Sequence, residues 1–346
     1  MKQRALSSDV IAGLDAARAF AAIYVVIHHV ASARGLSHSW GLIFRFGQEA
    51  VLVFFLLSGF VMFANERDRA CRPGGYCLRR LRRIYPPLIA AMIVSTLVAL
   101  DNGDLTQGYS TAELLGTLFG LQDISFLKPG VIVDPYLGND PLWSLSYELG
   151  FYALFPLVLV AWRRWPVVTN HLVGLICCLC YMGFALRPNH FALVGAYFLL
   201  WWCGAMTADA YLRGGRTVRA IGGVIVWLAI LCLVAGLVAI GQGRGRGIGY
   251  YPWLPVRHFA FGLAVLLVFF GPFGATLSRL TVSRKRLFAA GASISYGLYV
   301  LHYPLLVDWN VARSAIGLTT AFVILLLLAW LVERQLPRFL PRAPSS

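Results

Sequence analysis

The sequence has 346 residues, of which 59% are hydrophobic and only 13% are charged. A soluble chain of this length does not need so much apolar residue, so the composition excludes an ordinary soluble domain and indicates a protein that crosses a membrane several times. The formal net charge is +15. In a soluble protein this excess would suggest nucleic acid as a partner, but in a membrane protein we expect it in cytoplasmic loops, beside anionic lipid headgroups.

Ten apolar stretches are long enough to cross a bilayer, which takes about 20 mainly apolar residues. We expect no cleavable signal sequence, because residues 1–13 lack a small-residue cleavage site after a short apolar core. No segment suggests a separate soluble domain, so residues 1–346 are predicted to form one all-α, polytopic membrane domain. The predicted spans are about 14–34, 48–64, 84–101, 142–162, 167–186, 191–212, 218–240, 253–276, 289–310 and 314–334.

The segments between these spans alternate in charge. Those assigned to one side hold most of the basic residues, among them Arg67, Arg69, Arg72, Arg79, Arg80, Arg82, Arg83, Arg163, Arg164, Arg213, Arg216, Arg284, Lys285 and Arg286. Segment 102–141, on the other side, carries Asp104, Glu113, Asp123, Asp134 and Asp140 against Lys128 alone. The positive-inside rule then predicts that both chain ends are cytoplasmic, with the glycine-rich stretch 241–251 as an exception. Within 102–141, the stretch 110–127 has helix-like apolar spacing, typical of an interfacial or re-entrant piece.

The first predicted span contains Arg18 and His29, eleven residues apart. This spacing places them on nearly the same helix face, ~16 Å apart along the axis. Ionisable residues inside spans are costly and are candidates for function. Two alternatives stay open: Arg18 extends to the inner headgroups, or it faces a polar passage. His28 points about 100° away from His29, so one of the two is expected to be a structural hydrogen-bonding residue.

The second span contains a pair of small residues, and the third span follows a cluster of arginines and contains two prolines. Ser58–Gly59 in the second span permits either close helix packing or approach to a ligand. Residues 77–88 read CLRRLRRIYPPL, with Pro86–Pro87 placed to start or kink the third span. This arginine cluster is either a positive-inside anchor or a phosphate clamp, because guanidinium groups bind phosphate oxygens bidentately.

Two later spans carry further polar residues. Glu148 lies near the outer end of the fourth span, with Trp143 and Tyr147 around it, and needs a His or Arg partner on another helix. In the ninth span, Tyr296, Tyr299 and His302 recur at a spacing of three and line one stripe. An aromatic stripe is usually packing, and structural pairing would also explain Glu148.

These stretches together resemble acyltransferase family 3, membrane proteins that O-acylate sugars of bacterial surface glycans. The resemblance rests on five motifs in family order: Arg18 and His29 separated by ten residues; Phe54-Phe55-Leu56-Leu57-Ser58-Gly59-Phe60; Arg80-Leu81-Arg82-Arg83-Ile84-Tyr85-Pro86; Trp143-Ser144-Leu145 with Glu148; and Ser295-Tyr296, Tyr299, His302 and Pro304. The doubled His28–His29 and the alternative Arg79/Arg82 register depart from the family pattern.

The resemblance implies an O-acyltransferase of the cytoplasmic (inner) membrane that uses acetyl-CoA or another acyl-CoA as donor and a carbohydrate hydroxyl as acceptor. Arg80 and Arg83, with Arg18, would bind the CoA phosphates. His29 would be the general base, Glu148 would orient it, and His302 would complete the catalytic set. Ser58, Trp143, Tyr296 and Tyr299 would contact substrate or the developing oxyanion.

No metal-ligand spacing is present, and neither a metal nor a nucleic acid is expected. The seven cysteines fit small buried hydrophobes better than a disulfide framework. The competing function is a proton-coupled secondary transporter or flippase, in which the same ionisable residues would relay protons without acyl transfer.

Overall fold

The structure is a computed structural model that describes residues 6–36, 44–68, 73–243, 245, 247–270, 274 and 279–340. Regular structure in these ranges is helical, apart from an isolated bridge between Gln122 and Val133. Nine helices of the described chain are long and apolar enough to cross a membrane. The prediction of an all-α, polytopic membrane protein is therefore confirmed.

The long helices follow the predicted apolar stretches with shifted ends. They are α1 (Ser8–Ala33), α2 (Gly47–Glu66), α3 (Pro73–Asn102), α6 (Trp143–Arg164), α7 (Pro166–Leu186), α8 (His190–Leu212), α9 (Gly222–Gln242), α10 (Trp253–Phe270) and α14 (Ala315–Trp330). Shorter helices are α4 (Leu105–Gly108), α5 (Thr111–Phe119), α12 (Lys285–Ala292) and α13 (Ser295–Tyr303). Helix α5 lies within the stretch expected to be helical, and Ser110 caps it by accepting a hydrogen bond from the Glu113 amide.

The ninth predicted span, 289–310, is not one continuous helix. Helix α12 ends before Ser293, α13 begins at Ser295, and Pro304 opens a π-helical turn that runs to Asp308. The Ser293 and Ser295 hydroxyls donate to the carbonyls of Ala290 and Ala292, which offers these carbonyls a partner outside the helical pattern. Pro304 has no amide hydrogen to continue the helix. These residues explain why the described ranges hold nine continuous helices of spanning length where ten spans were predicted.

Helix α3 begins about ten residues earlier than the predicted third span. Arg79 to Arg83 therefore lie on a helix rather than in a loop, and Pro86–Pro87 lie inside that helix instead of starting it. Glu66, at the end of α2, forms ion pairs with Arg79 (2.6 Å) and Arg80 (2.9 Å), which holds this extension against α2. The position of the arginines is thus set by a tertiary contact as well as by helix propensity.

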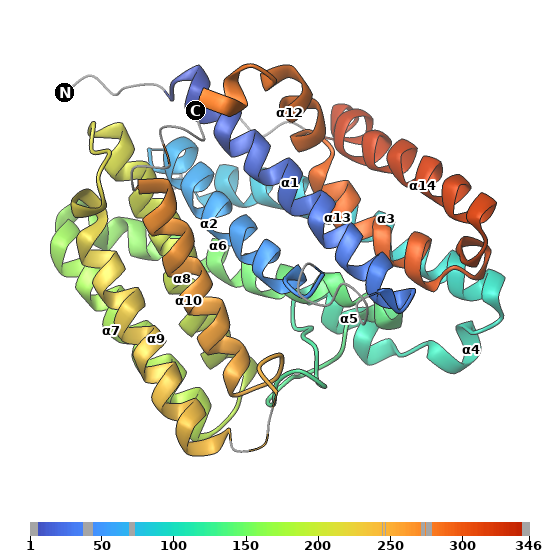
Figure 1. Cartoon of the computed structure of the whole chain (residues 1–346), viewed down its shortest axis with the longest axis horizontal. Coiled ribbons are helices and arrows are strands. Elements are labelled where there is room, and N and C mark those ends of the chain that lie inside the picture. Colours follow the sequence, from blue (N-terminus) through green and yellow to red (C-terminus); the bar gives the residue numbers. More distant parts are fainter. Residues whose placement is uncertain are drawn as a thin grey trace.

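The helices form two groups joined by α2 and α6 (Figure 1). One group contains α7, α8, α9 and α10, and the other contains α1, α3, α12, α13 and α14. Helix α2 packs very closely on α8: a Cβ atom added at Gly59 would lie 1.9 Å from the Trp201 carbonyl oxygen, and one at Gly204 would lie 2.0 Å from that of Leu56. Only glycine permits this approach, so close helix packing is one role of the Ser58–Gly59 pair.

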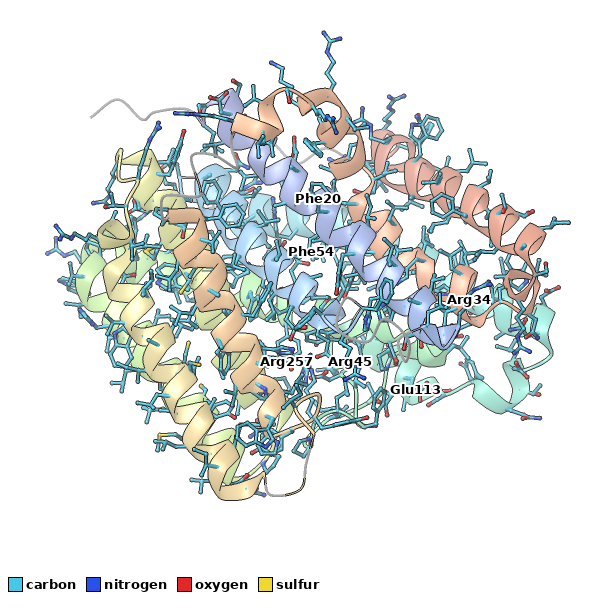
Figure 2. The ribbon with its side chains drawn as sticks, viewed as in Figure 1. Phe20, Arg34, Arg45, Phe54, Glu113 and Arg257 are labelled. Carbon is cyan, nitrogen blue, oxygen red and sulfur yellow. The ribbon has the colours of Figure 1, made fainter. Side chains whose placement is uncertain are left out.

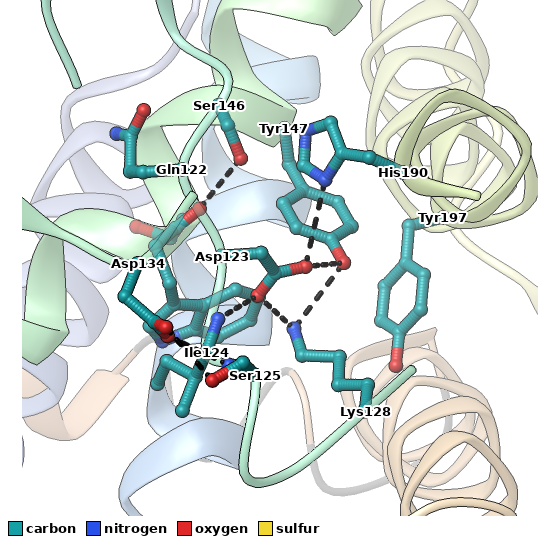
Figure 3. A network of polar contacts seen from close by, with 12 residues as sticks. Gln122, Asp123, Ile124, Ser125, Lys128, Asp134, Ser146, Tyr147, His190 and Tyr197 are labelled. Carbon is teal, nitrogen blue, oxygen red and sulfur yellow. Dashed lines mark hydrogen bonds and ion pairs between the residues drawn. The ribbon is translucent and has the colours of Figure 1, made fainter. Parts of the chain in front are cut away.

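A buried ionic network fixes the loop that leads into α6 (Figure 3). The Lys128 ammonium lies 2.5 Å from one Asp123 oxygen, and Tyr147 donates to the other at 2.7 Å. Lys128 also lies 4.1 Å from the centre of the Trp143 ring. Burial by itself raises the pKa of Asp123, but the Lys128 charge and the hydrogen bonds outweigh it and hold that pKa below its ordinary value. The network closes the wall of the bundle beside the first turns of α6.

Candidate active site

An inner cavity of about 260 Å³ lies between helices of the second group and the two central helices. Its wall combines both signs of charge with hydroxyl and aromatic groups, inside a region that apolar helices surround. The polar lining residues are Arg18, Ser58, Arg83, Ser144, Glu148, Ser295, Tyr296, Tyr299 and Glu333. The structure therefore brings together residues from all five sequence motifs, with Arg18 as the residue from the first.

A second cavity, of about 380 Å³, adjoins the first at the arginine cluster. The two are called the inner and the outer cavity by their depth in the protein, not by the side of the membrane. Arg83 and Glu333 line both cavities, so the two meet at this pair. The other lining residues of the outer cavity are Arg79, Arg80, Arg82, Pro87, Val332 and Pro337. A ligand bound at the arginine cluster would thus lie next to the inner cavity, with Arg83 and Glu333 between the two.

The four arginines of the cluster, at positions 79, 80, 82 and 83, differ in whether they have a partner. Arg79 and Arg80 pair with Glu66, and Arg82 donates to the Pro337 carbonyl at 2.9 Å. Arg83 forms neither an ion pair nor a hydrogen bond with any residue that the structure describes, and its side chain is exposed to the cavities. Of the predicted donor-binding residues, Arg83 is thus open to a ligand, whereas Arg80 is partly neutralised.

Arg18 faces the inner cavity rather than only the membrane surface. Its guanidinium lies 3.9 Å from the Asp15 carboxylate, one turn earlier on α1, and only 19% of its side chain is exposed. Of the two alternatives for Arg18, the structure supports the polar passage.

Glu148 lies in the cavity wall and is held by hydroxyl groups. Ser58 donates to its Oε1 atom at 2.9 Å, and the Tyr152 hydroxyl donates to the same oxygen. Trp201 in turn donates to the Ser58 hydroxyl at 3.2 Å. The predicted contact between Glu148 and His29 is not formed, because Glu148 points toward α2 and the cavity, whereas His29 packs against α13.

The partner of His29 is His302. The His29 Nδ1 and His302 Nε2 atoms are 3.0 Å apart. His302 is fully buried, and its Nδ1 atom lies 3.0 Å and 2.8 Å from the carbonyl oxygens of Leu298 and Tyr299. Since a carbonyl oxygen only accepts, Nδ1 of His302 carries the proton and its Nε2 accepts from His29. The neutral His29 ring then has its lone pair on Nε2, and His29 is partly accessible.

His28 has a structural role. Its Nδ1 atom bonds to the Phe44 carbonyl, and its ring lies so close to Gly47 that a Cβ atom there would be 2.2 Å from it. His28 therefore ties the end of α1 to the start of α2. This geometry favours His29 as the reactive imidazole.

Two aromatic rings stand between the inner cavity and the histidine pair. Tyr299 lines the cavity, and its ring centre lies 6.3 Å from that of His302. Phe54 packs on Tyr299 at 5.7 Å and faces the viewer on α2 in Figure 2. The Tyr299 hydroxyl donates to the Pro141 carbonyl at 2.5 Å and lies 2.8 Å from Ser144. Phe54 and Tyr299 thus line the inner cavity on the side nearest His302.

The remaining predicted residues divide into two kinds. Tyr296 lines the inner cavity, and its hydroxyl donates to the Ile84 carbonyl. Trp143 is only 3% exposed and packs between Phe55 and Tyr147, so the structure gives it a packing role instead of substrate contact. No group of histidine, cysteine, aspartate and glutamate suited to a metal ion is found in the ranges that the structure describes.

Sequence reasoning missed Glu66 and Glu333. Glu333 accepts the Gly297 amide hydrogen at 2.5 Å and sits in a π-helical turn, Leu331–Gln335, a feature often found at functional sites. It lies in the last turn of a predicted span, so the rule on intramembrane ionisable residues was the signal available for it. Glu66 lies just beyond its predicted span and offered no such signal.

Similar proteins are bacterial, and several are named for the modification of glycans. The chain is 28% identical to nodulation protein 10 of Rhizobium leguminosarum over 83% of its length and 81% of that protein. It is 28% identical to the exopolysaccharide production protein ExoZ of Rhizobium meliloti, over 65% of the chain and 66% of that protein. It is 22% identical to the peptidoglycan O-acetyltransferase OatA of Listeria monocytogenes over 92% of the chain, and spans about half (54%) of OatA. No solved structure matches the chain significantly.

A family profile matches almost the entire sequence. The profile described as an acyltransferase domain matches residues 11–333, a range that contains all five motifs and every lining residue of the two cavities except Pro337. The chain therefore belongs to acyltransferase family 3.

Proposed function

We propose that this protein is an O-acyltransferase that moves an acyl group, acetyl in the simplest case, from cytosolic acyl-CoA to a hydroxyl of a cell-surface, exopolysaccharide or lipid-linked sugar. The observation that carries the proposal is the pair of adjacent cavities that share Arg83 and Glu333. They extend from the arginine cluster on α3 to Tyr299, whose ring centre lies 6.3 Å from that of His302, the side chain paired with His29.

The donor enters at the arginine-lined cavity. Arg83 binds a phosphate of CoA, supported by Arg80 and Arg82, because a guanidinium group without a protein partner is available for a charge-assisted hydrogen bond. The arm of the donor then passes Arg83 and Glu333 into the inner cavity, where Arg18 adds a second positive charge. This direction places the donor side at the basic, cytoplasmic end predicted by the positive-inside rule.

The histidine pair supplies the proton transfer. The sugar hydroxyl gives its proton to Nε2 of His29 while its oxygen attacks the thioester carbonyl. The carbon–sulfur bond breaks, the ester forms, and the CoA thiolate leaves and takes up the proton that His29 held. His302 accepts the Nδ1 hydrogen of His29 throughout, which fixes the ring and stabilises the imidazolium. Movement of the wall formed by Phe54 and Tyr299 brings thioester and imidazole together.

The nature of the acceptor follows from the named relatives. Peptidoglycan and exopolysaccharide share a sugar hydroxyl as the reacting group, and a hydroxyl is what a neutral imidazole activates. A glycan of the bacterial surface, reached from the cytoplasmic membrane, is therefore the acceptor class that we propose.

The test is transfer of radiolabel from acetyl-CoA to membrane glycans in vesicles. Replacing His29 with glutamine is expected to lower the rate by about 10²–10⁴-fold with CoA binding retained. The matched change His28→Gln keeps most of the rate. Arg83→Met is expected to weaken CoA binding, while Arg213→Met, at an exposed arginine paired with Asp209, leaves it unchanged.

The wild-type result decides between the functions. If the wild type transferred no label from short acyl-CoAs and bound no CoA, the enzyme proposal would fail. Proton-coupled solute movement by the same vesicles would then support the transporter reading.

A further inference from the structure

The Glu148 carboxylate presents an open oxygen to the inner cavity. Both of its described hydrogen bonds, from Ser58 and Tyr152, end on Oε1. Among the described residues, no donor contacts Oε2. The Trp201–Ser58–Glu148 chain of hydrogen bonds holds the carboxylate firmly in this orientation. A ligand that donates a hydrogen bond would therefore find in Oε2 a charged acceptor that is already oriented.

A guanidinium group is open in the same cavity. Arg83 lines it from α3 while Glu148 lines it from α6, and none of the ion pairs among the described residues joins them. The two charges attract each other across the cavity but form neither a hydrogen bond nor an ion pair. The space between them suits a group that accepts a hydrogen bond at one end and donates one at the other.

A secondary amide is such a group. Its carbonyl oxygen accepts from a guanidinium, and its N–H donates to a carboxylate. The two arginines and two glutamates that line this cavity balance in charge, so an uncharged group suits it better than a further anion. A cavity of about 260 Å³ holds a narrow, uncharged chain and not a nucleotide.

We propose that Glu148 is a donor-binding residue that accepts an amide N–H of the pantetheine arm of acyl-CoA. Arg83, which lines both cavities and has five N–H donors, donates to a carbonyl of that arm as well as to the CoA phosphate. This inference rests on the proposed acyl-CoA donor and deepens it. Ser58 is the positioning residue that turns Oε2 toward the arm. Glu148 then serves affinity for the donor rather than the basicity of His29.

The test compares two ligands that differ in the arm. CoA carries the pantetheine chain, whereas adenosine 3′,5′-bisphosphate has the nucleotide phosphates without it. In detergent-solubilised protein, calorimetry should show that Glu148→Gln weakens CoA binding about tenfold or more and leaves adenosine 3′,5′-bisphosphate binding unchanged, because a carboxamide NH₂ at the Oε2 position opposes the ligand N–H. Glu113→Gln, at a carboxylate outside the cavity, should change neither affinity.

Kinetics separates a donor-binding role from a catalytic one. Glu148→Gln is expected to raise KM for acetyl-CoA much more than it lowers kcat. Equal weakening of both ligands, unchanged CoA binding, or a loss confined to kcat would each overturn the inference while leaving the acyltransferase proposal intact. A wild type that binds no CoA would overturn both.

Discussion

Tyr147 and Glu148 are neighbours on α6, yet they belong to polar regions of opposite kinds. Tyr147 turns toward α8, where it closes the network of Asp123 and Lys128 (Figure 3). Glu148 turns toward α2 and the cavity, where one of its oxygens is left open. The same helix thus contributes to a network in which the protein supplies every partner, and to a cavity in which one carboxylate oxygen is left for a ligand.

The comparison indicates that direct pairing of a charge, more than its burial, separates charges that stabilise the fold from charges that are open to a ligand. In the first region each charge has its counter-charge within the fold: Lys128 with Asp123, and on α10 Arg257 with Glu49, which is 1% exposed. In the second region Arg83 feels the charges of Glu148 and Glu333 but forms a direct ion pair with neither of them. Buried charges that satisfy each other add rigidity, whereas unsatisfied ones in a cavity mark a binding site.

The largest effect is expected from breaking the closed network. Lys128→Met leaves the buried Asp123 carboxylate without its cation, so the free energy of unfolding should fall by about 3–5 kcal/mol. Denaturant titration in detergent measures it. The double variant with Asp123→Asn should recover part of the loss, because it removes the unpaired charge. A loss below about 1 kcal/mol in Lys128→Met would contradict the closed-network description.

The next largest effect is expected on kcat, from breaking the pair formed by His29 and His302. His302→Leu removes the imidazole acceptor of the His29 Nδ1 hydrogen and leaves only the Val25 carbonyl, at 3.0 Å. It should lower kcat for acyl transfer by about 10–100-fold, the value of a hydrogen bond to a charged group. His302→Gln keeps an oxygen acceptor and should retain several-fold more activity than His302→Leu. If the two variants were equally inactive with unchanged stability, the acceptor role of His302 would be wrong.

Packing between α2 and α8 should be next in size. Gly59→Ala drives a methyl group into the Trp201 carbonyl and should lower the free energy of unfolding by about 1–3 kcal/mol. It should also disturb Ser58 and hence donor binding. Gly183→Ala is the matched control, because a Cβ atom there meets no atom within 4 Å. Equal stabilities of the two variants would show that the helices separate without cost.

The smallest effect is expected on the stability of the protein at low pH. Because the pKa of Asp123 is below its ordinary value of 3.8 in the folded protein, its pairing contributes stability above about pH 4, and this is lost as the pH falls further. The loss is at most about 1.4 kcal/mol per pH unit. Unfolding midpoints measured from pH 6 to pH 3 should fall less steeply in Asp123→Asn. Parallel curves for the two proteins would count against the pairing.

Several features of the site could be predicted from local sequence. Arg18 and His29 lie on one helix, so a spacing of eleven residues was enough to place them on one face. Ser58, Tyr296 and Tyr299 were found through motifs and do line the cavity. The contacts of Glu148 were predicted incorrectly, because its pairing depends on how α6 rotates against α2, and nothing in residues 142–162 encodes that rotation.

The sequence by itself determined the membrane class and the position of most helices, because each apolar run of about 20 residues must satisfy its own backbone within the bilayer. It also determined where positive charge concentrates. Only the tertiary structure decided which side chains meet: His29 with His302, Glu66 with Arg79 and Arg80, and Glu333 with the amide of Gly297. The physical reason is that helix formation is local, whereas the partner of a buried polar group is set by how helices far apart in the chain pack together.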